Sequence, residues 1–250
     1  MRVLTGTSGF SYAAWKGSFY PAGLPSRRML AHYASRLETV EVNATFYRVP
    51  RPETLATWRA EVPAGFLFAL KAPQRVTHVK RLRDVEGTVA AFYRASAELG
   101  SALGPVLYQL PPSFKKDLAL LADFLAILPA GGRASFEFRH ASWLSDDVYS
   151  TLSARGAALC LAEDDGSTTP AVATADFGYL RLRRSGYGEE DLRTWAARIL
   201  AQRWSEALVY FKHEEEARGP AFALALRELL GAAGPPRAQA PAPPTTAGQW

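Results

Sequence analysis

The sequence contains very little sulfur: its 250 residues include one cysteine, Cys160, and two methionines. A single cysteine excludes an intrachain disulfide and any metal site that needs several thiolates, and it is compatible with a reducing compartment. Because Cys160 lies within an apolar segment, we interpret it as a buried packing residue and not as a nucleophile.

Long apolar runs are also missing. No stretch approaches the roughly 20 residues that cross a bilayer. The opening segment, MRVLTGTSG, holds no apolar run typical of a signal peptide. We therefore expect a cytoplasmic protein with no membrane partner.

Several functional signatures are absent as well. The sequence has no dense run of Lys or Arg, and its net charge of +5 and pI near 9.4 permit an anionic ligand without being typical of a nucleic-acid-binding protein. No Gly-x-Gly-x-x-Gly follows the first predicted strand, which argues against a dinucleotide crevice. Without a His-x-His or His-Glu-x-x-His motif, we predict neither a metal nor a cofactor.

What the sequence does contain is a regular alternation of two kinds of segment. Short apolar segments that predict strands span residues 3–8, 39–47, 67–73, 105–111, 134–140, 157–162, 177–183 and 207–213. Between them, apolar residues recur at helical spacing. The segment 167–175 has the weakest pattern and is assigned one short helix, and a final helix is predicted over 220–230, ended by Gly231.

This alternation predicts the fold class. Eight strands alternating with about eight helices are typical of an α/β protein with a single-domain (β/α)8 TIM-like barrel, here over residues 1–231. A doubly wound open sheet is the alternative, but eight units favour closure. Residues 232–250 are rich in proline and alanine without periodicity, so we expect a flexible tail there.

Charged residues alternate with apolar residues in several predicted strands. One side of segment 39–47 carries Glu41, Asn43, Thr45 and Tyr47. One side of segment 134–140 carries Ser135, Glu137 and Arg139, while Lys71 and Arg181 lie in two further strands. Surface strands with polar residues facing water give the same pattern. Its recurrence near the strand carboxyl ends predicts instead that these side chains meet at the C-terminal mouth of a barrel.

Several short motifs occur in a characteristic order. They are Gly9-Phe-Ser-Tyr, Trp15-x-Gly-x-Phe-Tyr-Pro21, Val40-Glu-Val-Asn-Ala-Thr-Phe-Tyr47, Thr77-His78, Gln109-Leu-Pro-Pro112, Glu137-Phe-Arg-His140 and Tyr179-Leu-Arg181. Together, over about residues 3–212, they resemble the YecE-like family, domain of unknown function 72. The resemblance implies a TIM-like barrel without an established activity. Its motif positions correspond to Glu41, Asn43, Phe46, Tyr47, Lys71, His78, Gln109, Glu137, Arg139 and Arg181. Many relatives have a Phe-x-Asn segment after the last strand, whereas this chain has Tyr210-Phe-Lys-His213.

The predicted mouth combines carboxylates, cations and aromatic rings, which indicates acid–base chemistry on a small phosphorylated or carboxylated substrate by a hydrolase or lyase. We assign catalysis to Glu41, Lys71 and Glu137. We assign substrate binding to Asn43, Tyr47, His78, Gln109, Arg139, Arg181, Lys212, Tyr12, Trp15 and Tyr187.

Other interpretations remain open at this stage. A retaining glycosidase also needs two carboxylates, although cationic surroundings favour a charged substrate over a neutral sugar. Metal catalysis is opposed by Lys71 and Arg181, which would repel a divalent cation. The charges could also form a buried network that only stabilises the barrel. A nucleic-acid-binding barrel, nuclease-like or holding a base between aromatic rings, and a non-catalytic ligand-binding module are further alternatives. No protein partner is indicated.

Overall fold

The computed structural model describes residues 1–233 and is a closed barrel of eight parallel strands, each hydrogen-bonded to the next, with β8 closing on β1. The strands are β1 (Arg2–Ser8), β2 (Thr39–Val42), β3 (Leu67–Lys71), β4 (Leu103–Gln109), β5 (Ala134–Glu137), β6 (Ala158–Glu163), β7 (Phe177–Leu182) and β8 (Glu206–Phe211). The predicted single-domain (β/α)8 fold is therefore confirmed.

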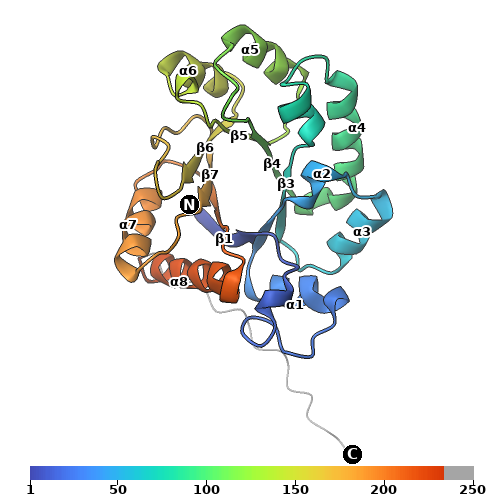
Figure 1. Ribbon diagram of the computed structural model, residues 1–250, viewed down its shortest axis with the longest axis vertical. Coiled ribbons are helices and arrows are strands. Elements are labelled where there is room, and N and C mark those ends of the chain that lie inside the picture. The colour runs from blue at the N-terminus through green and yellow to red at the C-terminus, as the bar shows by residue number, and fades with distance from the viewer. Residues whose placement is uncertain (234–250) are drawn as a thin grey trace, which may run out of the picture.

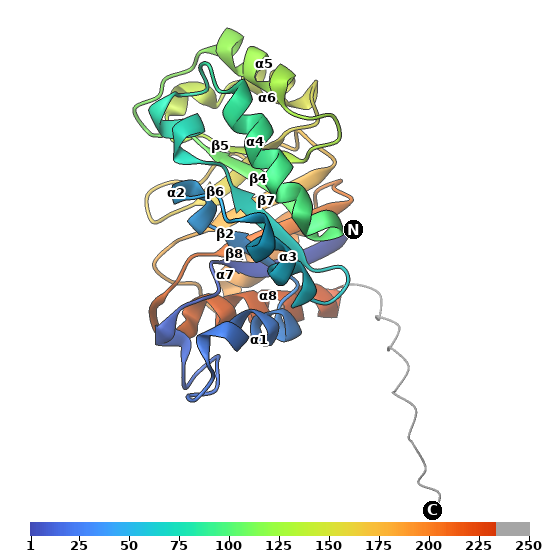
Figure 2. The same ribbon diagram turned by 90° about the vertical axis from the view of Figure 1, so that its right-hand side faces the viewer.

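An outer ring of helices covers the strands (Figure 1). The helices are α1 (Met29–Arg36), α2 (Ala44–Tyr47), α3 (Pro52–Ala60), α4 (Glu86–Ser96), α5 (Leu118–Ile127), α6 (Asp146–Ser153), α7 (Glu189–Leu200) and α8 (Arg218–Ala233). Figure 2 shows the barrel from the side, with the N-terminus at one end and α2 at the other. The end near α2 is the C-terminal mouth, since α2 directly follows β2.

The buried side chains form two separate apolar regions. The larger lies between the strands and the helices. The smaller fills the barrel axis and contains Leu4, Leu67, Ala69, Leu107, Ala158, Cys160, Ala162, Phe177, Tyr179, Leu208 and Tyr210. These residues alternate along their strands with residues of the outer core, as the two-residue period of a strand requires. Cys160 is fully buried, as predicted.

The first predicted strand–helix boundary that the structure corrects is the end of β2. The sequence predicts a strand through Tyr47, but the strand stops at Val42 and Ala44–Tyr47 form one helical turn, α2. The Thr45 hydroxyl lies 2.9 Å from the Val42 carbonyl oxygen and 2.7 Å from the Lys71 carbonyl oxygen. The Thr45 hydroxyl thus bonds the carbonyls of Val42 and Lys71, which would otherwise be free to continue the hydrogen bonding between β2 and β3. The bond to Lys71 holds α2 against the end of β3.

Two other expectations are wrong. No helix lies between β6 and β7 in the described chain; a loop occupies that place between α6 and α7 (Figure 1). The sequence predicts that Gly231 ends the last helix, but α8 continues through it to Ala233. Gly231 does not adopt the left-handed conformation with which a glycine ends a helix. The predicted tail, 232–250, lies outside the described residues from 234 onward.

Candidate functional site

Two glutamates and one arginine form a buried cluster at the C-terminal mouth. Arg181 of β7 lies between Glu41 of β2 and Glu137 of β5. Its Nη2 is 2.8 Å from Oε1 of Glu41, and its Nη1 is 2.5 Å from Oε2 of Glu137. All three side chains are at most 3% exposed. Residues 140 positions apart in the sequence therefore meet, as the strand pattern predicts.

Further donors complete the coordination of Glu41. The Ser8 hydroxyl donates to Oε1 at 2.7 Å, and the Tyr179 hydroxyl donates to Oε2 at 2.7 Å. Both residues lie on the inner side of their strands, where they reach Glu41 from β1 and β7. With Arg181, they leave this carboxylate with partners on both oxygens.

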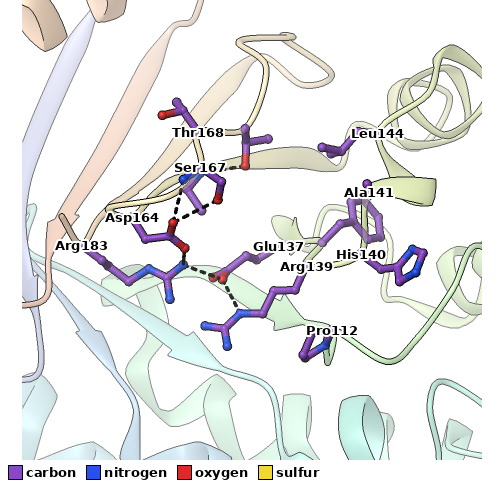
Figure 3. Close-up of a pocket in the computed structure, with 13 residues that line it drawn as sticks. Pro112, Glu137, Arg139, His140, Ala141, Leu144, Asp164, Ser167, Thr168 and Arg183 are labelled. Carbon is purple, nitrogen blue, oxygen red and sulfur yellow. Dashed lines mark hydrogen bonds and ion pairs between the residues drawn. The ribbon is translucent and has the colours of Figure 1, made fainter.

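Glu137 is surrounded in the same way by cations and an amide. Its Oε1 accepts from Gln109 Nε2 at 2.9 Å and from Arg139 Nε at 3.0 Å, and it lies 3.2 Å from Arg183 Nη2. Figure 3 shows the guanidinium groups of Arg139 and Arg183 reaching the carboxylate from two sides. The Nε of Arg183 is buried and has no hydrogen-bond partner among residues 1–233.

The cluster keeps both carboxylates ionised. Burial alone would raise the pKa of Glu41, but Arg181 and the hydroxyls of Tyr179 and Ser8 outweigh it and hold the pKa below its usual range. Burial would likewise raise the pKa of Glu137, and Arg181 with its neighbouring arginines lowers it well below its usual range. Neither carboxyl group is therefore suited to donate a proton near neutral pH.

Lys71, the last residue of β3, differs from its neighbours because its amine has no ion pair or hydrogen bond to any other residue in the described chain. Its Nζ lies 4.3 Å from the centroid of the Phe46 ring. Burial, and then the positive charge of Arg181, lowers the pKa of Lys71 to about 8, although the charges of Glu41 and Glu137 act in the opposite direction.

His78 lies beside Lys71 in the helical turn Arg75–Val79, which follows β3. Its ring packs edge-on against Phe46 with 4.9 Å between centroids, and its Nδ1 is 2.8 Å from the Thr77 hydroxyl. Burial and the positive charge of Lys71 lower the pKa of His78, so the imidazole is neutral at physiological pH.

Two cavities open at the mouth and share Arg183. The first has a volume of about 410 Å³ and is lined by Glu137, Arg139, Arg183 and the helix-free loop after β6 (Figure 3). The second, of about 530 Å³, is lined by Arg183, Lys212, His213 and their neighbours. The loop that replaces the predicted helix at 167–175 thus forms a wall of the site.

The remaining predicted residues lie in different environments. Lys212 is exposed in the second cavity, and Asn43 lies at the start of α2. Tyr47 does not share the inner face with Glu41, since α2 turns it outward until it is 75% exposed. The structure brings together Glu41, Glu137, Gln109, Arg139 and Arg181 by direct contact.

Of the four aromatic residues assigned to substrate binding, Trp15 and Tyr187 are buried and cannot contact a ligand in this structure. Trp15 is 1% exposed and donates from Nε1 to the Glu214 carbonyl, which ties together the loops after β1 and β8. Tyr187 is buried against Phe211 and Phe222. Tyr12 is half-buried, and its hydroxyl donates to the Ser8 carbonyl. These three side chains therefore hold the loops at the mouth in place.

Sequence reasoning missed three partners in the cluster, namely Ser8, Tyr179 and Arg183. Their strand parity was available as a signal for Tyr179 and Arg183, which share a face with Arg181. Ser8 ends β1 with no neighbouring charge in the sequence to mark it. No group of three or more His, Cys, Asp or Glu side chains placed to hold a metal ion occurs within residues 1–233. Over the same residues, no helix is long and apolar enough to cross a membrane.

The sequence model of the family described as "Protein of unknown function DUF72" matches residues 4–247. The chain belongs to the DUF72 family. Among curated family relatives, UPF0759 protein YecE of Escherichia coli is 33% identical over 112 residues, which are 44% of this chain and 41% of YecE. UPF0759 protein YunF of Bacillus subtilis is 29% identical over 140 residues, 53% of this chain and 50% of YunF. The chain thus spans half or less of the length of these relatives.

Solved structures of DUF72 family proteins share the barrel. The one from Thermotoga maritima has a TM-score of 0.80 and 28% identity, over 92% of this chain and 99% of that chain. One from Enterococcus faecalis has a TM-score of 0.75 and 18% identity, over 92% and 95% of the two chains, and this likeness concerns the fold alone. The family description assigns no activity.

Proposed function

We propose that this protein is an enzyme that acts on a small anionic substrate, phosphorylated or carboxylated, by acid–base chemistry at the C-terminal mouth of the barrel. The observation that carries the proposal is the unpaired amine of Lys71 beside a cluster in which every carboxylate is already occupied. A titratable group whose pKa is shifted toward neutrality, and which has no structural partner, is typical of a catalytic acid or base.

The charges of the mouth favour an anionic ligand. Four cations, Lys71, Arg139, Arg181 and Arg183, face two buried carboxylates, Glu41 and Glu137, which leaves an excess of two positive charges. Asp164 offsets little of this excess because it is half exposed and 3.9 Å from Arg183. A phosphate or carboxylate group entering the first cavity would meet the guanidinium groups of Arg139 and Arg183, which line it.

The proposed roles follow from these contacts. Lys71 transfers the proton, and Arg139 and Arg183 bind the substrate anion. Glu41 and Glu137 serve catalysis by fixing Arg181 and balancing its charge. A retaining glycosidase is not favoured, because it needs one protonated carboxyl group and the pKa of each glutamate is lowered.

Anion binding is tested by thermal unfolding with inorganic phosphate, pyrophosphate or citrate, each compared with sodium chloride at equal ionic strength. We expect at least one anion to raise the Tm by about 5–10 °C at 100 times its Kd. The Arg139→Met variant should lose most of this shift. Arg193→Met removes an exposed arginine that pairs with Glu189 on α7, and it should keep the shift. If no anion raises the Tm, or if Arg139→Met responds like wild type, the proposal fails.

Catalysis is tested with metabolites that stabilise the protein in a phosphorylated and carboxylated library. We expect turnover of at least one of them, with a kcat lower by about 100-fold or more in Lys71→Met. The variant should still bind the anion through Arg139 and Arg183. Equal turnover by Lys71→Met would contradict the role given to Lys71.

One observation favours nucleic-acid binding as a second candidate. Tyr47 is a 75% exposed aromatic residue, and it packs edge-on against Phe46 at the mouth. Exposed rings beside cations stack on unpaired bases. Affinity for a single-stranded oligonucleotide that falls steeply with salt and is lost in Tyr47→Ala would support this candidate, and no binding at low salt would remove it.

A further inference from the structure

We infer that Lys71 is a nucleophile that forms an imine with the carbonyl carbon of its substrate, so that the substrate class is a small anionic aldehyde or ketone. This inference rests on the proposed function for the site and the anionic substrate, and it replaces proton transfer by Lys71 with covalent catalysis by the same amine. An amine that only relays protons needs no particular electrophile, whereas an imine-forming amine restricts the substrate to carbonyl compounds such as 2-oxo acids or sugar phosphates.

The position of the amine suits this role. Lys71 ends β3 at the mouth, and its Nζ lies over the Phe46 ring at 4.3 Å. The ring contacts the amine through its face and is not a conventional hydrogen-bond acceptor for it. Within residues 1–233, no carboxylate forms an ion pair with Nζ. Over the same residues Nζ also makes no hydrogen bond, so no protein group occupies its lone pair when the amine is neutral.

A structural role as counter-ion is already filled by other residues. The oxygens of Glu41 accept from Ser8, Tyr179 and Arg181, while those of Glu137 accept from Gln109 and arginines. Lys71 contributes charge to the same environment without contacting either carboxylate. The barrel would keep its ion pairs if this amine were neutral.

The surroundings also maintain a reactive fraction of neutral amine. Burial and the charge of Arg181 lower the pKa of Lys71 to about 8. At pH 7 about a tenth of the molecules then carry the free amine, on the order of 200-fold more than for a lysine with an ordinary pKa. Desolvation near a second cation is a known way to activate a lysine for attack on a carbonyl.

The chemical step balances without an added oxidant or reductant. The Nζ lone pair forms a bond to the carbonyl carbon, the carbonyl π electrons move to oxygen, and a proton shift from nitrogen to oxygen gives the carbinolamine. Uptake of one proton from solvent and loss of water leave a protonated imine. This cation can accept the electron pair of a C–H or C–C bond at the adjacent carbon and become a neutral enamine; the proton of the C–H bond passes to solvent, or the fragment beyond the C–C bond leaves as a second carbonyl compound, as in a lyase. Arg139 and Arg183 line the first cavity and hold the anionic group; Lys71 does not line this cavity, so the carbonyl group extends from it toward Nζ, which lies within the electrostatic reach of Arg139 and Glu137.

Reductive trapping tests the inference. The full chain is incubated at pH 7 with glyoxylate, a small anionic aldehyde, and sodium cyanoborohydride, and the carboxymethylation of each lysine is measured by peptide mass spectrometry. We expect Lys71 to react at least about tenfold faster than the other lysines, because more of its amine is neutral. The internal controls are Lys16, Lys80, Lys115, Lys116 and Lys212.

Matched variants separate an imine site from general lysine reactivity. Lys71→Arg keeps the positive charge and should lose the fast labelling, whereas Lys16→Met, at an exposed loop residue, should leave Lys71 labelling unchanged. Arg139→Met should slow labelling by glyoxylate more than labelling by the neutral aldehyde glycolaldehyde, since only glyoxylate carries the anion, while the loss of the Arg139 charge at Lys71 affects both reagents alike.

The outcomes distinguish this inference from the proposed function. Labelling of Lys71 no faster than that of the other lysines would overturn the imine. If the anion-dependent rise in Tm and the turnover that depends on Lys71 were retained in that case, the proposed function would stand. Loss of both the labelling and the anion effect would overturn both.

Discussion

Arg181 is the residue on which the charge balance of the mouth depends. It joins two carboxylates that are almost completely buried, and those carboxylates in turn hold its own pKa well above the usual value despite burial. A buried charge is tolerated only when it is paired. Removing the arginine would leave two buried carboxylates without their shared partner and would destabilise the folded protein.

We expect Arg181→Leu to lower the free energy of unfolding by about 3–5 kcal/mol, because Glu41 and Glu137 would lose their shared partner. Urea denaturation followed by circular dichroism measures this change. The control is Arg193→Leu, whose exposed pair with Glu189 should contribute about 0.5 kcal/mol or less. Similar effects of the two substitutions would show that the cluster carries no special stability.

The same contacts predict how stability depends on pH. Because the folded-state pKa of Glu41 is lowered, its stabilising contribution is complete above the unfolded pKa of about 4.3 and is lost as the pH falls toward the folded pKa. The stability difference between wild type and Glu41→Gln should therefore shrink as the pH falls below about 5. Urea midpoints measured from pH 7 to pH 3 test this, and a difference independent of pH would contradict it.

At the scale of the secondary-structure elements, β1 and β2 must approach closely for the cluster to form. A Cβ added at Gly6 would lie 2.0 Å from the Thr39 carbonyl oxygen, which is a backbone atom that cannot move aside. Gly6 pairs with Thr39, two residues before Ser8 pairs with Glu41. The glycine therefore sets the spacing that lets Ser8 donate to Glu41.

We expect Gly6→Ala to destabilise the protein by about 1–3 kcal/mol, since the methyl group must push β1 and β2 apart. Gly87→Ala on α4 is the matched control: nothing lies within 4 Å of its added Cβ, and it should be neutral or stabilising by up to about 1 kcal/mol. Thermal unfolding of both variants provides the measurement. Equal stability of the two would refute the steric argument.

The elements show what the sequence could and could not predict. A strand places alternate residues on opposite faces, so parity was enough to bring Glu41, Lys71, Glu137 and Arg181 to the inside of the barrel. The ends of the strands depended on tertiary contacts. The Thr45 hydroxyl binds a carbonyl of β3 at 2.7 Å, which no local pattern around residues 39–47 records.

The loops were predicted less well for a similar reason. The burial of Trp15 depends on the Glu214 carbonyl, about 200 residues further along the chain. Which cation binds which carboxylate also depends on the barrel closing, because the pairing of β8 with β1 brings Arg181 of β7 near Glu41 of β2. Composition and periodicity describe single segments and do not encode such pairings.

At the scale of the whole molecule, the barrel concentrates residues from separate strands at one mouth, where the Lys71 amine has no ion pair or hydrogen bond within residues 1–233. The likeness to DUF72 structures extends over 92% of the chain, so the same architecture frames this mouth in relatives. The fold explains why residues from separate strands meet at the mouth. The proposed chemistry depends on the protonation state of Lys71.

The most direct test of this account is the pKa of the Lys71 amine in the folded protein. Trace labelling with acetic anhydride across a pH series, with each lysine quantified by mass spectrometry, gives the midpoint at which each amine loses its proton. We predict a midpoint of about 8 for Lys71, well below the value of about 10.4 that is usual for lysine side chains. A Lys71 amine that titrates together with the other lysines would contradict the account.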